Sequence, residues 1–252
     1  MTNTYFHSPE PPSTNLVTPG RVLAIGAHPD DIEFGAGATL AKWSQGGTEI
    51  AFVIMTDGSK GTWDPEANTL NLAVLRQGEA RKAAGTIAGS STVNFLGWTD
   101  GELLANDRSV AQLCFIMRKF RPNVVLGHDP WKRYRLHPDH RAAGFATTDA
   151  LVASRDPHFL PELGPHHRPD ALLLFEADEP NHCEAFGEVA LRIKIEALLC
   201  HRSQHVSSME ISNLGEDEEL RHFKETVRSA SERTGASFGL ELGESFRLIR
   251  EL

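Results

Sequence analysis

Two short motifs carry the residue types that could do chemistry in this 252-residue chain. The first is HPDD at residues 28–31, in which His28 and Asp31 are three residues apart. A turn that contains proline can direct an imidazole and a carboxylate towards one point, and zinc binds both kinds of donor. The second is HPDH at residues 137–140, whose two histidines share one face at the start of a predicted helix. Two imidazoles and one carboxylate leave a coordination position open for water, as catalytic metal sites do.

Each motif also has a simpler interpretation, in which its aspartate caps the helix that follows. Metal binding is the better interpretation because the tripeptide HPD occurs twice, each time between a predicted strand and a predicted helix. The adjacent residues Asp30 and Asp31 support it, since capping needs only one carboxylate. Two like charges side by side are unfavourable unless a cation lies near them.

The elements that must position these motifs predict a single Rossmann-like α/β domain with a mostly parallel sheet flanked by helices. Apolar runs of strand length alternate with longer helical patterns, which is the order that βαβ crossovers produce. The predicted strands span residues 22–27, 50–56, 93–96, 124–127 and 171–176. The predicted helices span residues 35–46, 72–83, 110–120, 138–153, 186–202 and 216–235. Residues 1–20, with four prolines, are predicted to form an extended or disordered N-terminal arm, and residues 21–252 the domain.

Three polar loops follow predicted strands at one edge of this sheet. They are HPDD at 28–31, TDGSKG at 56–61 and the long loop 128–140. Ligands of open α/β sheets bind beyond the carboxyl ends of the strands, so these loops define the expected site. His128 and Asp129, which end the fourth strand, are therefore candidates for contact with a substrate or with the residues that bind the metal. Their alternative is a hydrogen-bonded pair that serves only the strand end.

The composition argues against several classes of protein. The formal net charge is −9 and basic residues form no long block, so a nucleic-acid partner is not expected. Apolar runs have strand length, so no membrane span is expected, and the first 20 residues lack the pattern of a signal peptide. The cysteines at 114, 183 and 200 are odd in number and far apart, which indicates reduced thiols in a cytoplasmic protein.

The motifs together resemble the PIG-L/LmbE family of zinc-dependent de-N-acetylases. The resemblance rests on AHPDD-x-E-F-G-x-G-x-T-L at 27–40, TDGSKG at 56–61 and HPDH at 137–140, and it extends over residues 21–205. Supporting matches are LRxxE at 75–79, LGWxD at 96–100, and Lys194 with HxSQ at 201–204. The family includes N-acetylglucosaminyl-phosphatidylinositol deacetylases and the deacetylases of the mycothiol and bacillithiol pathways.

The resemblance implies a role for each polar residue of the two main motifs. The zinc ligands would be His28, Asp31 and His140. Asp30 would be the general base that takes a proton from the zinc-bound water, and His137 would stabilise the oxyanion and protonate the leaving amine. Asp139 would orient His137 as its carboxylate partner, unless it serves only as a helix cap.

Residues outside the two motifs would contact the substrate. Arg76 and Asp100 match positions that contact the sugar in relatives, although Arg76 is also placed to form a solvated ion pair with Glu79. Some relatives carry a tyrosine two residues before the first histidine of HPDH, where this chain has Arg135 next to Tyr134. Either the loop shifts to bring Tyr134 in, or Arg135 contacts the substrate instead. We expect Arg135 to do so.

The implied activity is that of a cytoplasmic amidohydrolase that depends on Zn2+, with Fe2+ as the alternative metal. It would remove an N-acetyl or other short acyl group from an amino sugar or its conjugate by attack of a zinc-bound water. The sequence has no GxSxG motif, which disfavours a covalent serine route. Relatives form homo-oligomers, so the resemblance also implies a trimer or hexamer.

Three alternatives stay open. Two histidines and a carboxylate also bind Fe(II) in oxygenases, although those enzymes generally use a different scaffold. A non-catalytic sugar- or metal-binding protein would keep the same fold. The glycine pattern at 35–40 suggests a nucleotide-binding module, but it lacks the third glycine of that motif and does not follow a strand directly.

Overall fold

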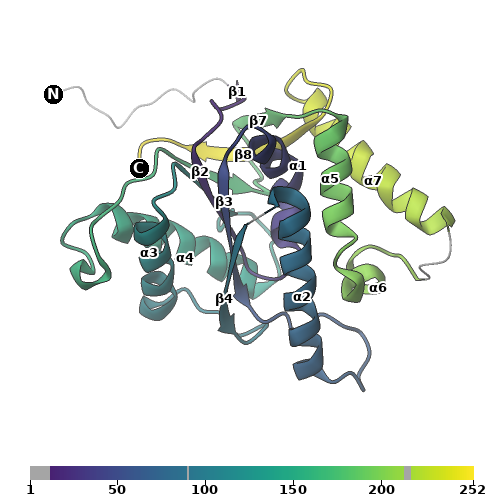
Figure 1. Ribbon diagram of the computed structural model, residues 1–252, viewed down its shortest axis with the longest axis horizontal. Helices are drawn as coiled ribbons and strands as arrows, with labels where there is room; N and C mark the ends of the chain where they lie inside the picture. Colours follow the sequence, from purple (N-terminus) through teal and green to yellow (C-terminus); the bar gives the residue numbers. More distant parts are fainter. Residues whose placement is uncertain (1–11, 90, 213–216) are drawn as a thin grey trace.

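The computed structural model describes residues 12–89, 91–212 and 217–252. Within them, eight strands form one sheet in the order β1-β7-β8-β6-β5-β2-β3-β4, flanked by helices (Figure 1). The strands are β1 (Ser13–Thr14), β2 (Arg21–Gly26), β3 (Glu49–Thr56), β4 (Thr92–Trp98), β5 (Val124–His128), β6 (Ala171–Phe175), β7 (His182–Ala185) and β8 (Gly243–Ile249). The helices are α1 (Asp31–Gln45), α2 (Thr69–Ala88), α3 (Asp107–Phe120), α4 (Pro138–Arg155), η1 (Pro161–Leu163), α5 (Glu188–Leu198), η2 (Arg202–Gln204), α6 (His205–Ser208) and α7 (Asp217–Ala236).

The expected α/β domain with a mostly parallel sheet is confirmed. Strands β4, β3, β2, β5 and β6 run parallel to one another, whereas β8 runs antiparallel to both β6 and β7. The strands β1, β7 and β8 were not expected. Of the predicted arm, residues 1–11 lie outside the described residues, and Ser13–Thr14 pairs with β7. No described helix is long and apolar enough to cross a membrane.

Two apolar layers hold the helices against the faces of the sheet. β2 and β3 are buried along nearly their whole length, which is why their sequences are continuous apolar runs. Helices α1, α2, α5 and α7 pack on one face, around Trp43 and Phe52. Helices α3 and α4 pack on the other, around Leu23, Met55 and Met117. Burying a large apolar side chain contributes about 1.5–3 kcal/mol, so these layers hold the edge of the sheet rigidly.

The order in which the chain adds strands to the sheet reverses between β2 and β5, although these two strands are parallel. β3 and β4 lie on one side of β2, whereas β5 and β6 lie on the other. A switch point of this kind leaves a crevice at the carboxyl ends of the two strands. α1 begins at Asp31, just after β2, and α4 begins at Pro138, after the loop that follows β5. The fold therefore places HPDD and HPDH beside the same crevice.

One glycine sets how closely α1 approaches the sheet. A Cβ atom added at Gly35 would lie 2.6 Å from Cδ2 and 2.7 Å from Cγ of Phe175, at the end of β6. Gly35→Ala is therefore expected to lower the free energy of unfolding by about 1–3 kcal/mol, as overpacking does. Denaturant unfolding would measure this change. The matched control is Gly78→Ala in α2, where the added Cβ meets nothing within 4 Å, and it is expected to stabilise by up to about 1 kcal/mol. Equal stability of Gly35→Ala and the natural chain would contradict the close approach.

Candidate metal centre and active-site cavity

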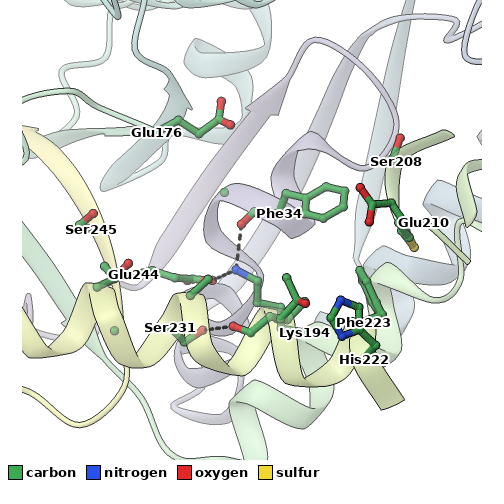
Figure 2. Close-up of a pocket in the computed structure, with 17 residues that line it drawn as sticks. Phe34, Glu176, Lys194, Ser208, Glu210, His222, Phe223, Ser231, Glu244 and Ser245 are labelled. Atoms are coloured by element: carbon green, nitrogen blue, oxygen red, sulfur yellow. Dashed lines mark hydrogen bonds and ion pairs between the residues drawn. The ribbon is translucent and has the colours of Figure 1, made fainter. Parts of the chain in front are cut away.

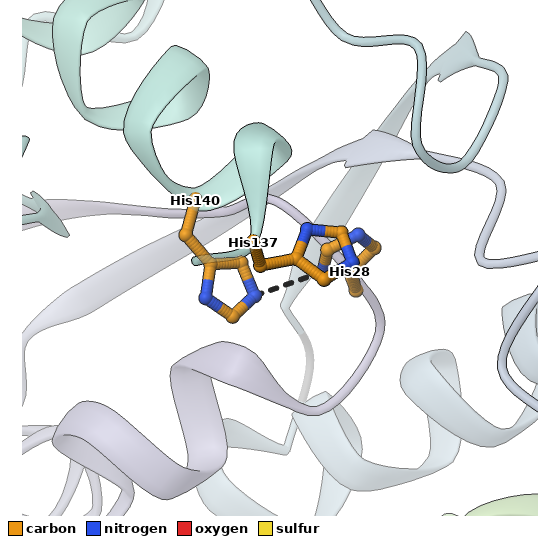
Figure 3. A group of neighbouring side chains, drawn as sticks. All are labelled: His28, His137 and His140. Atoms are coloured by element: carbon orange, nitrogen blue, oxygen red, sulfur yellow. Dashed lines mark hydrogen bonds between the residues drawn. The ribbon is translucent and has the colours of Figure 1, made fainter. Parts of the chain in front are cut away.

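The HPDD and HPDH motifs bring three donor side chains together. His28 Nδ1 lies 3.1 Å from His140 Nε2 and 3.4 Å from Asp31 Oδ2. His140 Nε2 lies 3.2 Å from Asp31 Oδ1. Figure 3 shows the rings of His28, His137 and His140 gathered between the loop after β2 and the start of α4. The three residues predicted as ligands are thus in mutual contact.

The spacing of these donor atoms fits a small divalent ion. A tetrahedral zinc ion with bonds of about 2.0–2.2 Å needs donors about 3.3 Å apart. The two imidazole nitrogens are 3.1 Å apart, and each lies 3.2 or 3.4 Å from a different carboxylate oxygen of Asp31. Among the described residues, three overlapping groups have donor atoms within 4.8 Å of one another. The groups are His28 with His137 and His140, Asp31 with His128 and His140, and His28 with Asp100, His137 and Asp139. The side chains present therefore fit a metal ion.

Two carboxylates orient the ring of His28 from the side opposite the cluster. His28 Nε2 lies 3.1 Å from Asp139 Oδ2 and 3.2 Å from Asp100 Oδ1. Asp139 in turn accepts hydrogen bonds from the backbone N–H groups of Gly101, over 2.6 Å, and Leu103, over 3.1 Å. Metal-binding histidines commonly donate their second ring nitrogen to a carboxylate, which fixes the ring. The arrangement leaves Nδ1 of His28 facing His140 and Asp31.

The expected pairing of Asp139 with His137 is wrong. The carboxylate of Asp139 faces His28, and it is the backbone N–H of Asp139 that donates to His137 Nδ1, over 3.3 Å. The reason is that Asp139 is wholly buried, where the loop after β4 supplies two N–H donors to its carboxylate. His137 is exposed at the N-cap of α4, with its ring centroid 4.6 Å from that of His28. Burial lowers the pKa of His137, and His28 and His140 lower it further, which makes its protonated form a stronger acid.

Asp30 stands beside the cluster in a strained backbone conformation. Its φ of 107° lies in the left-handed region that residues other than glycine rarely adopt, and such strain is typical of functional sites. Arg76 holds the turn, because its Nη2 donates to the carbonyl of Pro29 over 2.6 Å and lies 3.5 Å from Asp30 Oδ2. Burial raises the pKa of Asp30 to about 7, against the lowering effect of Arg76. A carboxylate of this kind can accept a proton near neutral pH.

Arg76 forms no solvated ion pair with Glu79. Its guanidinium is buried, and Nη1 donates to the carbonyl of Gly58 over 2.8 Å. Glu79 instead accepts hydrogen bonds from the backbone N–H and the hydroxyl of Ser203, over 2.9 and 2.6 Å. That alternative is wrong, and Arg76 joins the two loops that follow β2 and β3.

Glu176 is a residue of this site that the sequence interpretation missed. It follows β6 at the same edge, with a φ of 59°, and its Oε2 lies 2.6 Å from Arg135 Nη2 and 3.4 Å from His128 Nδ1. Burial raises the pKa of Glu176, but the adjacent imidazole of His128 and guanidinium of Arg135 outweigh it and hold the pKa at about 2. His128 Nε2 lies 3.1 Å from Asp31 Oδ2, and Arg135 Nε donates to His140 Nδ1 over 2.8 Å. The available signal was a carboxylate at the last residue of the predicted strand 171–176, at the edge where the other polar loops begin.

Two other residues of the long loop lie away from the cluster. Tyr134 is 92% exposed and does not line the cavity over the cluster, so the shift that would bring it in is not seen. Asp129 Oδ1 accepts a hydrogen bond from the backbone N–H of Trp131 over 3.0 Å and faces a separate hollow beside Arg133. His128 supports Asp31 from behind, which is one of the roles expected for it, whereas Asp129 closes a turn. Contact of either residue with a substrate stays a prediction.

A cavity of about 470 Å³ opens over the cluster. Its volume is within the range of small-molecule sites, about 300–1,000 Å³. Its lining joins the three predicted ligands and Asp30 to further polar side chains from helix α2 and from the loops after β3, β4, β5 and β6, namely Arg76, Lys60, Asp100, Arg135, His137 and Glu176. Of the expected substrate contacts, Arg76, Asp100 and Arg135 are therefore brought to one place.

The fold and the cluster together define an α/β protein with a candidate metal centre at its switch point. The family model PIG-L, described as GlcNAc-PI de-N-acetylase, matches residues 23–151. This chain belongs to the PIG-L family, and the resemblance of its motifs is confirmed.

Individual relatives extend the similarity beyond that segment. A diacetylchitobiose deacetylase from Thermococcus kodakarensis is 34% identical over 197 residues, which cover 73% of this chain and 70% of that protein. A 1D-myo-inositol 2-acetamido-2-deoxy-alpha-D-glucopyranoside deacetylase from Saccharopolyspora erythraea is 32% identical over 166 residues, 56% of this chain and 60% of that protein. The solved structure of N,N'-diacetylchitobiose deacetylase from Pyrococcus horikoshii superposes with a TM-score of 0.80 at 30% identity, over 92% of this chain and 84% of that one.

Proposed function

We propose that this chain is a metal-dependent N-deacetylase that hydrolyses the acetamide of an N-acetylated amino sugar or its conjugate. The observation that carries the proposal is the contact of His28, Asp31 and His140, with the buried carboxylate of Asp30 beside them in one cavity. The names of relatives, which refer to diacetylchitobiose and to an N-acetylglucosaminyl inositol, support the substrate class. Zn2+ is the metal we propose, with Fe2+ as the alternative.

The proposed ligands are His28, Asp31 and His140. When bound there, a divalent ion supplies a Lewis acid, which makes water more acidic and polarises an amide carbonyl. Asp139 and Asp100 hold His28 in the tautomer that keeps Nδ1 free to bind. His128 and Arg135 fix Asp31 and His140 from behind.

Asp30 and His137 are proposed to transfer protons. Asp30 takes a proton from the water that attacks the carbonyl carbon, since it is buried beside the ligands and its pKa is raised. The carbon–nitrogen bond then breaks, and His137, exposed to the cavity, donates a proton to the departing nitrogen. The products are acetate and the free amino sugar. Arg76, Asp100 and Arg135 are proposed to shape the part of the cavity that receives the sugar. Association into a trimer or hexamer and a cytoplasmic location stay predictions.

Metal content and hydrolysis together test the proposal. Protein loaded with zinc is expected to carry about one divalent ion per chain, since the donor groups of the described residues overlap at one place and the proposed ligands form one set of three. It should release acetate from members of a panel of N-acetylglucosamine conjugates. Acetate release should stop when the ion is removed by a chelator and should recover when zinc is added back. His140→Ala is expected to lose the ion, whereas His158→Ala, at an exposed loop residue, should keep it. Full metal occupancy in His140→Ala would show that the ligand set is wrong. Failure of the loaded protein to release acetate from any conjugate would refute the activity.

A further inference from the structure

A second cavity, of about 420 Å³, lies beneath α7 and next to the active-site cavity. The two cavities share three lining residues, Phe34, Glu176 and Ser208, so they adjoin one another. Figure 2 shows Phe34 and Glu176 on one side of this second cavity and His222 and Phe223, from α7, on the other. We call it the α7 cavity.

Phe34 separates the two cavities. Phe34 lies three residues after Asp31 in α1, which is about 4.5 Å along the helix axis. Phe34 is therefore about the width of one sugar ring away from this proposed metal ligand. Lys194 Nζ donates to the carbonyl of Phe34 over 2.8 Å and to Glu244 Oε1 over 2.6 Å. Glu244 also accepts two backbone N–H groups of α1. Because Lys194 and Glu244 are buried, the boundary between the cavities is a fixed part of the fold.

The lining of the α7 cavity combines apolar faces with short polar groups. Phe34 and Phe223 supply two aromatic side chains, and Phe34 is 37% exposed although it is apolar. The short polar side chains are Ser208, His222, Thr226, Thr234 and Ser245. A sugar or cyclitol ring has the matching chemistry, because its C–H faces pack on aromatic rings and its hydroxyl groups both donate and accept hydrogen bonds.

The charges of the α7 cavity restrict its ligand further. Its lining holds the carboxylates of Glu176, Glu210 and Glu244 against the single ammonium of Lys194, which Glu244 already pairs. Arg135 pairs Glu176 from the neighbouring cavity, so Glu210 is left facing this one. A phosphate group would meet repulsion here, since like charges a few ångströms apart are unfavourable. An uncharged ring would meet no such repulsion.

We propose that the α7 cavity is a subsite for a second ring of the substrate, an uncharged sugar or cyclitol joined to the N-acetylated sugar. This inference rests on the proposed function, because it places the acetamide at the metal centre and the second ring beyond Phe34. The substrate is then a neutral glycoside, and both a lone amino sugar and a phosphorylated conjugate are poorer substrates.

Filling the cavity from α7 tests the subsite. In the zinc-loaded full chain, Thr226→Trp is expected to lower kcat/KM for N,N'-diacetylchitobiose at least about tenfold more than for N-acetylglucosamine. Retained turnover of the single sugar shows that the variant folds. Lys224→Trp is the matched control, since it adds the same bulk at an exposed position of the same helix and should leave the ratio unchanged. An unchanged ratio in Thr226→Trp overturns the subsite.

A binding measurement separates the subsite from the activity. In the slow Asp30→Asn background, calorimetry should show that Thr226→Trp weakens binding of the disaccharide while Lys224→Trp does not. If the natural chain releases no acetate and this weakening is still seen, the proposed function fails and the subsite stands. If acetate is released but neither binding nor the ratio changes, the subsite fails and the function stands.

Binding of a charged and an uncharged ligand tests the restriction to uncharged rings. An N-acetylglucosaminyl inositol with a phosphate on the inositol ring is expected to bind at least about tenfold more weakly than the uncharged compound, and Glu210→Lys should narrow that difference. Equal binding of the two compounds would overturn the restriction to uncharged rings. The restriction would also be overturned if Glu210→Lys left the difference in binding between the two compounds unchanged.

Discussion

Asp31→Ala is expected to lose the metal ion and nearly all hydrolysis. Asp31 supplies the carboxylate that faces both imidazoles, at 3.4 Å from His28 Nδ1 and 3.2 Å from His140 Nε2. The change also removes the acceptor of the His28 backbone N–H, which donates to Asp31 Oδ2 over 2.7 Å. Residues that only support metal ligands contribute about 10–100-fold in affinity, so loss of a ligand should exceed that range. Metal content after dialysis against a zinc buffer and acetate release would measure both effects.

Asp149→Ala is the matched control for this change. Asp149 is an exposed carboxylate on α4, so its removal should leave metal content and turnover unaltered. Excess zinc is expected to restore part of the occupancy of Asp31→Ala but little of its rate, because two imidazoles alone do not fix the geometry. Normal zinc content in Asp31→Ala would remove Asp31 from the ligand set.

Asp30→Asn is expected to retain the metal and to lower the rate by about 10²–10⁴-fold, the usual contribution of a general base. Asparagine keeps the size of the side chain and tolerates the left-handed backbone that Asp30 adopts, so the turn should persist. The acidic limb of the pH–rate profile should flatten as well. Burial raises the pKa of Asp30 to about 7, and the carboxylate gains a proton as the pH falls, so the natural chain loses its base on the acidic side. A bound cation lowers the pKa of Asp30, so the acidic limb of the pH–rate profile is expected below pH 7.

The two aspartates are distinguished by opposite outcomes. If Asp30→Asn loses its metal while Asp31→Asn keeps both metal and rate, their roles are reversed. If neither change alters the rate, hydrolysis does not use these carboxylates at all. The assignment depends on the turn, in which Asp31 faces three histidines while Asp30 faces Arg76.

The parallel strands could be predicted because burial on both faces leaves a simple trace in the sequence. The runs predicted at 22–27, 50–56, 124–127 and 171–176 agree with β2, β3, β5 and β6 to within one residue at each end. β7 and β8 left no such trace. The four residues of β7 include a histidine and a glutamate that pair with each other, and in β8 partly buried or exposed positions interrupt the buried ones. Both strands are fixed by partners far away along the chain, as in the pairing of Leu172 with Ile249.

The contact of HPDD with HPDH could be predicted, whereas the partners around it could not. Loops after parallel strands meet at one edge, so two motifs at strand ends are expected to converge. Which carboxylate serves which histidine depends on where the loop after β4 lies. There, Gly101 and Leu103 draw Asp139 towards His28 and away from His137. The position of Glu176 depends likewise on the packing of β6 beside β5.

The distance along the chain between the proposed ligands links metal supply to folding. His28 and His140 are 112 residues apart and come from strands on opposite sides of the switch point. The unfolded chain therefore offers no comparable set of donors, and an ion that binds there favours the folded state. Each tenfold excess of free ion over its dissociation constant adds about 1.4 kcal/mol to the free energy of unfolding. In surroundings depleted of the metal, the folded fraction of the chain would decline together with its activity, so metal availability would control the abundance of the protein as well as its rate.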